Sequence, residues 1–227
     1  KVIKNMVVED GGALKKAAEG KRAEDAAYRI RLKFSKTGDM RFLGHLELVA
    51  MITRAIRRAG LRLRYSQGFH PLPKISFSPP LPVGMESMEE YMDIELNSSE
   101  RAGEKEILER LNTALPQGIK FYEARLMPLK LPLPSAIMTE YLIILKNGPL
   151  GINIEPDRID GFLRDFLSQD SIPVRIEKEE KVREIDIRPM LADISSIGDL
   201  TLKLVLKKGE GASVRPHDVL ARLFNLS

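Results

Sequence analysis

The chain has 227 residues, of which 43% are hydrophobic, and its formal net charge at pH 7 is +4. It contains no cysteine, which excludes disulfides, thiolate catalysis, zinc-thiolate sites and an iron–sulfur cluster bound by this chain. No apolar run has the length of a membrane span, and the first residues lack the apolar region of a signal peptide. We therefore expect a cytoplasmic protein without a membrane partner.

Residues 1–27 are rich in Ala, Lys, Glu and Gly and show no pattern that would bury one face. Such a composition predicts a linker or a flexible arm. The sequence begins with Lys rather than Met, so we expect it to be a fragment of a longer, fused protein.

Residues 28–127 are expected to form the first domain. Tyr28–Phe34 alternates apolar and basic side chains, which predicts a half-buried strand with one basic face. Residues 42–59 have apolar side chains at helical spacing, and Gly60 follows them, which predicts a helix and its end. The remaining predicted elements are strands at 61–65, 90–96 and 119–126 and a helix at 100–115. The resulting order β-α-β-β-α-β is that of a ferredoxin-like unit.

Residues 128–139 form a Pro-rich linker in this interpretation, and residues 140–227 form a second domain with a similar order of elements. Its predicted strands lie at 140–146, 174–179, 184–194 and 199–207, and its predicted helices at 156–168 and 216–226. The predicted fold class is therefore α+β, with two ferredoxin-like (βαββαβ) units in tandem. The second unit lacks a closing strand, so either that strand lies beyond Ser227 or the unit is a variant.

Positive charge is concentrated between residues 28 and 82, a stretch that contains eleven Lys and Arg residues and only two acidic residues. The net charge of this stretch is +9, and that of the remaining chain is −5. A basic face of this kind predicts a polyanionic partner, with RNA as the first candidate, although a solvated basic surface has the same composition. The candidate RNA-binding residues are Arg41, Arg54, Arg57, Arg58, Arg62, Arg64, Phe69, His70 and Lys74.

A Pro-rich stretch from Tyr65 to Glu86 separates two predicted strands. Its prolines fix the backbone and remove donors, which predicts a stiff, ordered loop rather than a helix. Tyr65, Phe69 and Phe77 lie between basic residues, as in proteins that hold single-stranded RNA by stacking and phosphate contacts. The alternative is a purely structural crossover. We expect Phe77 in the core and Phe69 at the surface.

Four side chains are candidates for catalysis, namely His45, Tyr65, His70 and Lys74. A histidine near basic groups suits general acid–base chemistry or phosphate contact, and the alternative is that His45 buttresses the loop. The three histidines of the chain share no metal-ligand spacing, and no phosphate-binding glycine motif is present. We therefore expect no metal and no nucleotide cofactor on this chain.

The segments FLGHLELVAMITRAIRRAGL and YSQGFHPLPKISFSPPLPVGMESMEEYMDIEL resemble the radical SAM-linked domain family. Its members are domains of unknown function that are fused to, or encoded beside, a radical SAM protein. The resemblance covers roughly Tyr28 to Phe224. The family pattern reads approximately S-H-L-D in the helix and Y-S-x-G-F-N-P-H-P-K in the loop. Here Glu47 replaces Asp, His70 replaces Asn and Leu72 replaces His.

The resemblance implies that the partner is a radical SAM protein or fused domain, which would carry the S-adenosylmethionine and the iron–sulfur cluster. The predicted function is a non-catalytic accessory module that presents RNA, such as tRNA or rRNA, or another anionic substrate. The basic helix, the basic face of the first strand and the Pro-rich loop would then form one surface.

Two alternatives stay open. One is a metal-independent RNA-processing endonuclease, because a tandem of ferredoxin-like units with an early helix histidine looks like the RAMP-type CRISPR RNA endonucleases. The other is a protein-docking module whose basic face meets an acidic partner.

Overall fold

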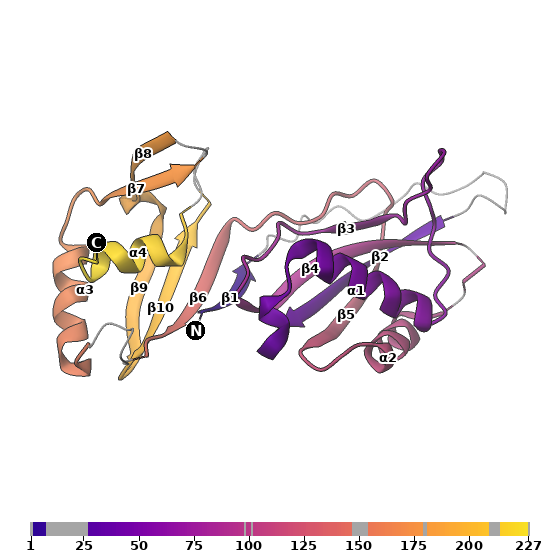
Figure 1. Cartoon of the computed structure of the whole chain (residues 1–227), viewed down its shortest axis with the longest axis horizontal. Coiled ribbons are helices and arrows are strands. Elements are labelled where there is room, and N and C mark those ends of the chain that lie inside the picture. The colour runs from indigo at the N-terminus through magenta and orange to yellow at the C-terminus, as the bar shows by residue number, and fades with distance from the viewer. Residues whose placement is uncertain are drawn as a thin grey trace. The chain divides into compact units, whose positions relative to one another are not determined.

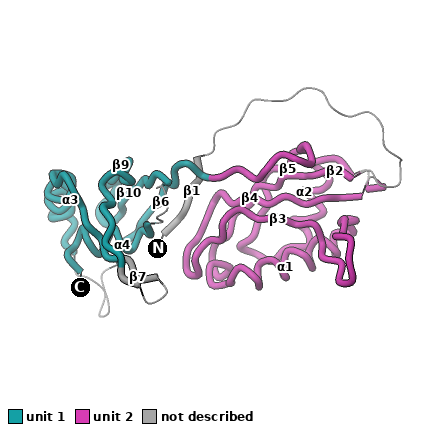
Figure 2. The backbone as a smooth tube through the Cα atoms, turned by 90° about the horizontal axis from the view of Figure 1, so that it is seen from above, with its two compact units in different colours: residues 1–8, 136–227 teal, residues 9–135 magenta. Residues whose placement is uncertain are grey.

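The computed structural model describes residues 2–7, 27–97, 99–100, 102–146, 154–178, 181–208 and 214–226. The chain divides into two compact units (Figure 2). Unit 1 comprises residues 1–8 and 136–227, and unit 2 comprises residues 9–135. Both contain antiparallel sheets and helices, so the predicted α+β class is confirmed.

Unit 2 has the strand order of a ferredoxin-like sheet. The order is β5-β2-β4-β3, and each pair of neighbours is antiparallel. Helices α1 and α2 pack on one face of this sheet (Figure 1). The elements are β2 (Ala27–Lys36), the 3₁₀ helix η1 (Gly38–Phe42), α1 (His45–Arg58), β3 (Ile75–Phe77), β4 (Glu86–Asn97), α2 (Glu104–Ala114) and β5 (Ile119–Met127).

The alternation along β2 sorts its side chains between the two faces of the sheet. Ile30, Leu32 and Phe34 are buried in the core that α1 and α2 cover. Arg29, Arg31 and Lys33 therefore lie on the opposite face, because successive side chains of a strand alternate. The expectation that the basic helix and the basic strand face form one surface is thus wrong, since the sheet lies between them.

The second strand predicted for this unit, at residues 61–65, is reduced to isolated bridges. Leu63 pairs with Leu96, and Tyr65 pairs with Pro73. The regular strand β3 comes later, after the prolines that interrupt ladder pairing. Helix α1 also begins later than predicted, at His45, because residues 38–42 form η1 instead.

The strands of unit 1 follow the order β1-β6-β10-β9, in which each pair of neighbours is antiparallel, and β7 and β8 form a separate hairpin. The core of unit 1 lies between the sheet and the helices α3 and α4. The elements are β1 (Val2–Val7), β6 (Met138–Ile144), the 3₁₀ helix η2 (Pro156–Arg158), α3 (Ile159–Leu167), β7 (Pro173–Lys178), β8 (Lys181–Asp186), the 3₁₀ helix η3 (Arg188–Met190), β9 (Leu191–Gly198), β10 (Thr201–Lys207) and α4 (Pro216–Leu223).

Strand β1 corrects the prediction that residues 1–27 are a linker. It pairs antiparallel with β6, from Val2 opposite Ile143 to Val7 opposite Met138. In a ferredoxin-like sheet the fourth strand lies beside the first, and β1 takes this place beside β6. The segment VIKNMV contains β-branched residues that favour a strand, whereas the Ala- and Lys-rich composition begins after it. Residues 8–26 lie outside the described residues.

The Pro-rich stretch predicted as a linker at 128–139 divides between the units at Ser135 and Ala136. Its first part is held by unit 2, because Arg29 donates to the Leu131 carbonyl (2.6 Å) and Arg31 to the Pro132 carbonyl (2.8 Å). Its last residues, from Met138, already belong to β6. Among the described helices, none is long and apolar enough to cross a membrane.

Candidate anion-binding surface

The segment Arg64–Lys74 of unit 2, called the 64–74 loop below, folds back on itself at the edge of the sheet. The Lys74 amide donates to the Arg64 carbonyl (2.8 Å), and the Ser66 amide donates to the Leu72 carbonyl (2.8 Å). The Leu72 amide donates in turn to the Ser66 hydroxyl (3.0 Å). Gly68 has φ +151°, a conformation that side chains disfavour. The loop is therefore ordered by its own hydrogen bonds.

The tip of the 64–74 loop presents an aromatic ring to solvent. Phe69 is fully exposed, as expected, and His70 and Leu72 beside it are exposed as well. Phe77 behaves differently, because it is partly buried and packs edge-on against Phe34, with ring centroids 6.5 Å apart. Of the two phenylalanines, only Phe69 can stack on a ligand without a rearrangement of the core.

Exposed arginines lie in α1 and in the turn after it, and one of them contacts the 64–74 loop from the helix side of the sheet. Arg57 donates to the Tyr65 hydroxyl (3.4 Å), which connects the helix to the loop. Arg58 donates to the Ala114 carbonyl (2.7 Å), and Arg54 and Arg62 are exposed. None of these four arginines forms an ion pair with a described acidic residue. Their charge is therefore available to an anion.

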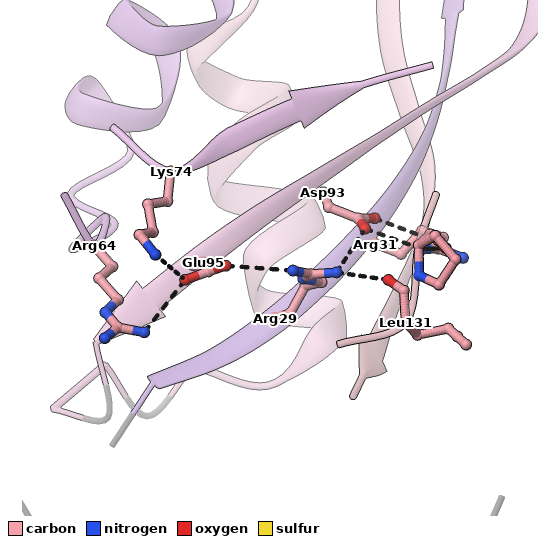
Figure 3. Close-up of polar contacts among 8 residues, drawn as sticks. Arg29, Arg31, Arg64, Lys74, Asp93, Glu95 and Leu131 are labelled. Carbon is pink, nitrogen blue, oxygen red and sulfur yellow. Dashed lines mark hydrogen bonds and ion pairs between the residues drawn. The ribbon is translucent and has the colours of Figure 1, made fainter. Parts of the chain in front are cut away.

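The other side of the loop faces the open side of the sheet, where cations surround two carboxylates of β4 (Figure 3). Glu95 lies within ion-pair distance of Arg29 (3.4 Å), Arg64 (3.4 Å) and Lys74 (3.6 Å). Asp93 lies 3.7 Å from Arg29 and forms the close pair with Arg31 that is described below. The side chains of Arg64 and Lys74 are thus placed together by the sheet.

Much of the predicted basic face is neutralised by acids of β4. Lys33 pairs with Glu89 (2.6 Å), and Arg41, a predicted RNA-binding residue, pairs with the buried Glu86 (3.2 Å). The stretch with net charge +9 ends at residue 82, just before the strand that supplies these carboxylates. The surface that carries excess positive charge is therefore smaller than the sequence indicates. It consists of the arginines without an ion pair and of the cations that share the Glu95 carboxylate, and it is centred on the 64–74 loop.

His45 lies apart from the loop, at the first turn of α1. Its ring packs edge-on against Phe77, with centroids 5.6 Å apart. Beside it is a cavity of about 10 Å³, enough for one water, which Lys36, Ser78 and Glu90 help to line. These three buried side chains were missed by the sequence reasoning, because a polar residue in or beside a strand gives no sign of burial in the sequence.

The buried polar groups around this cavity hold the start of α1. The Lys36 ammonium donates to the Leu43 carbonyl (2.6 Å), and Ser78 donates to the Glu90 carboxylate (3.2 Å). Burial lowers the pKa of Lys36, and the negative charges of Glu90 and Glu47 oppose this shift. This arrangement fits the alternative in which His45 has a buttressing role.

The four candidates for catalysis have separate surroundings. His45 contacts Phe77, Tyr65 contacts Arg57, Lys74 contacts Glu95, and His70 lies in the exposed part of the loop. Within the described part of the chain, no hydrogen bond, ion pair or ring contact joins two of them. No group of three or more His, Asp or Glu side chains among the described residues is arranged to hold a metal ion.

Fold and site together define an α+β protein with a ferredoxin-like unit whose edge loop carries cations on both of its sides. Residues 29–216 match the family described as "Uncharacterized protein conserved in bacteria (DUF2344)", and the chain belongs to this family. No curated protein matches the chain.

Proposed function

We propose that this chain is a binding module that holds RNA, or a similar polyanion, at the 64–74 loop and the adjoining arginines of α1. We further propose that it presents this substrate to a radical SAM enzyme, either fused or separate. The choice of partner rests on the resemblance of the helix and loop motifs to the radical SAM-linked domains.

One observation carries the proposal. The 64–74 loop has cationic side chains on both of its sides and a fully exposed phenylalanine at its tip. Arginine and lysine neutralise phosphates, and an exposed aromatic ring can stack on an unpaired base whatever the identity of that base. A partner with regularly spaced negative charges and flat rings satisfies both features, and RNA is such a partner.

The module has a binding role in this proposal, and the chemical step belongs to the partner. The S-adenosylmethionine and the iron–sulfur cluster would be carried there, since this chain has no cysteine to ligate a cluster. The exposed position of the loop suits this division, because a substrate held at its tip stays accessible to another protein.

The test is a titration of the whole chain with a fluorescent single-stranded RNA over a salt series. Each phosphate contact contributes about 0.7 to the slope of log affinity against log salt. We expect the double variant Arg57→Gln, Arg58→Gln to lower the slope by about 1.4 and the affinity by about tenfold. The matched control is Arg164→Gln with Arg175→Gln, which removes two exposed arginines from unit 1.

Equal affinities of the wild type and the Arg57, Arg58 variant would contradict the assigned surface. Absence of RNA binding by the wild type at low salt would contradict the proposal as a whole. In that case the exposed arginines would be assigned to protein docking, and a pull-down with the radical SAM partner would follow.

A further inference from the structure

The cluster around Asp93 and Glu95 contains two kinds of ion pair (Figure 3). Arg31 holds Asp93 through two short hydrogen bonds of 2.8 and 3.0 Å, and the Asp93 side chain is only 4% exposed. These distances are close to those of strong charge-assisted hydrogen bonds. The Arg31–Asp93 pair therefore satisfies its own charges and has a structural role.

Arg64 and Lys74 are held differently. Both approach the same oxygen, Oε2 of Glu95, at 3.4 and 3.6 Å, which is longer than a strong charge-assisted bond. Arg29 approaches the other oxygen of this carboxylate at 3.4 Å. An ammonium has three donors and a guanidinium has five, so Arg64 and Lys74 keep donors that Glu95 does not use.

The charges of the cluster do not balance. Among the residues that the structure describes, four cations, Arg29, Arg31, Arg64 and Lys74, surround two carboxylates, which leaves a net charge of +2. The side chains of Arg64 and Lys74 are 32% and 39% exposed, and those of Arg29 and Arg31 are less so. The excess charge is therefore accessible at Arg64 and Lys74.

The backbone fixes these two side chains next to each other. The Lys74 amide donates to the Arg64 carbonyl. The Arg64 amide donates to the Glu95 carbonyl (2.8 Å), and the Glu95 amide donates to the Lys74 carbonyl (3.0 Å). Since both cationic groups also lie within 3.6 Å of one oxygen atom, a single phosphate group is large enough to contact both. Little ordering of the protein is needed for such a contact, which favours affinity.

We propose that Arg64 and Lys74 form a subsite for a phosphomonoester, namely the terminal phosphate of an RNA strand. This inference rests on the proposed function and adds the end of the strand to it. A phosphomonoester carries a charge of about −1.5 to −2 at pH 7 and three terminal oxygens, which matches an excess charge of +2 and two adjacent cations. An internal phosphodiester carries only one negative charge.

The experiment compares single-stranded RNAs of one sequence that differ only at their ends. The probes carry a 5′-phosphate, a 3′-phosphate, hydroxyls at both ends, or a terminal phosphate blocked as its methyl ester. We expect one phosphorylated end to bind about tenfold more tightly than the hydroxyl RNA, as an added charge-assisted hydrogen bond would produce. The methyl ester should lose most of this gain.

The variants Lys74→Gln and Arg64→Gln are each expected to abolish the preference for the phosphorylated end. Both should still bind the hydroxyl RNA, because the arginines of α1 remain. Arg62→Gln is the matched control, since it removes an exposed cation outside the cluster and should weaken both RNAs by the same factor. Circular dichroism of each variant verifies the fold.

The outcomes separate this inference from the proposed function. Equal affinity for phosphorylated and hydroxyl RNA would overturn the subsite and leave RNA binding intact. Absence of binding to every RNA would overturn the proposed function itself. A nucleoside monophosphate that binds as tightly as the phosphorylated RNA would overturn the assignment to an RNA end, because the subsite would then be one for free phosphomonoesters.

Discussion

Arg31 and Asp93 face each other across strands β2 and β4 and form a bidentate ion pair, with Nε–Oδ1 and Nη2–Oδ2 distances of 2.8 and 3.0 Å. The same guanidinium donates to the Pro132 carbonyl at 2.8 Å. One side chain thus joins two neighbouring strands to the segment that follows β5. The Asp93 carboxylate is nearly buried, so the ion pair with Arg31 is protected from screening by solvent.

Replacement of Asp93 by asparagine is expected to destabilise the protein by about 3 kcal/mol. The change leaves the guanidinium groups of Arg31 and Arg29 largely buried without the carboxylate between them. Urea unfolding followed by circular dichroism measures the loss. A change below about 1 kcal/mol, as for a surface ion pair, would contradict the structural role.

Replacement of Glu95 by glutamine is expected to change the stability of the protein little and its affinity for RNA more. Its partners Arg64 and Lys74 are partly exposed and held at longer distances, so we expect a loss of only about 1 kcal/mol. Removal of the competing carboxylate should also raise the affinity for 5′- or 3′-phosphorylated RNA several-fold. Weaker binding by Glu95→Gln would show that Glu95 positions the two cations rather than competing for them.

Gly118 and Gly38 provide a matched pair of glycine substitutions. Both have positive φ, +96° at Gly118 and +59° at Gly38. A Cβ atom at Gly118 would lie 2.6 Å from the Thr37 carbonyl oxygen, whereas nothing lies within 4 Å at Gly38. We expect Gly38→Ala to cost about 1 kcal/mol from backbone strain alone, and Gly118→Ala about 3 kcal/mol. Thermal unfolding of both variants tests the difference, and equal costs would contradict it.

Alkaline pH is expected to weaken the contribution of Tyr91 to stability. Burial, followed by the hydrogen bond that its hydroxyl donates to Glu89 (2.7 Å), raises the pKa of Tyr91 far above 10.0. The unfolded chain loses this phenol proton first as the pH rises, so the contribution is complete below pH 10 and declines above it.

The measurement compares the wild type with Tyr91→Phe by urea unfolding from about pH 8 to about pH 11. The difference in unfolding free energy between the two should shrink, or reverse in sign, over this range. A constant difference would show that the pKa of Tyr91 in the folded protein is not raised.

Deletion of residues 1–7 is expected to weaken unit 1 and to leave the core of unit 2 unchanged. The strand β1 occupies one edge of β6, and its loss exposes backbone groups that are otherwise paired. Hydrogen exchange should become faster at the amides of β6. The amides that pair β2 with β5 are the internal control, and equal acceleration in both places would contradict the assignment of β1 to unit 1.

Local patterns in the sequence predicted much of the fold. The alternation of Tyr28–Phe34 gave the correct faces of β2, and the apolar spacing after residue 42 gave α1 to within a few residues. These predictions succeed because each depends on side chains that are close in sequence. The isolated bridge at Leu63 was predicted as part of a full strand, because the β-propensity of a segment does not show which neighbouring strand it can pair with.

The candidate site was less predictable, because its charges are set by pairing over long distances in sequence. Glu95 meets Arg29 from 66 residues away and Arg64 from 31 residues away. A charge count along the chain cannot include such partners unless the register of β4 is known. Phe69 was placed correctly at the surface because its neighbours, a glycine and a histidine before a proline, exclude a packed strand.

The position of β1 has a consequence for synthesis of the protein. Unit 1 is discontinuous, since β1 precedes unit 2 in the sequence and its partner β6 follows unit 2. Unit 2 consists of consecutive residues and can complete its core on the ribosome before β6 has been made. Closure of unit 1 then requires pairing of β1 with β6, which lie more than 100 residues apart, and contacts of such long sequence separation form slowly. We therefore expect refolding in two phases, with unit 2 forming in the faster one.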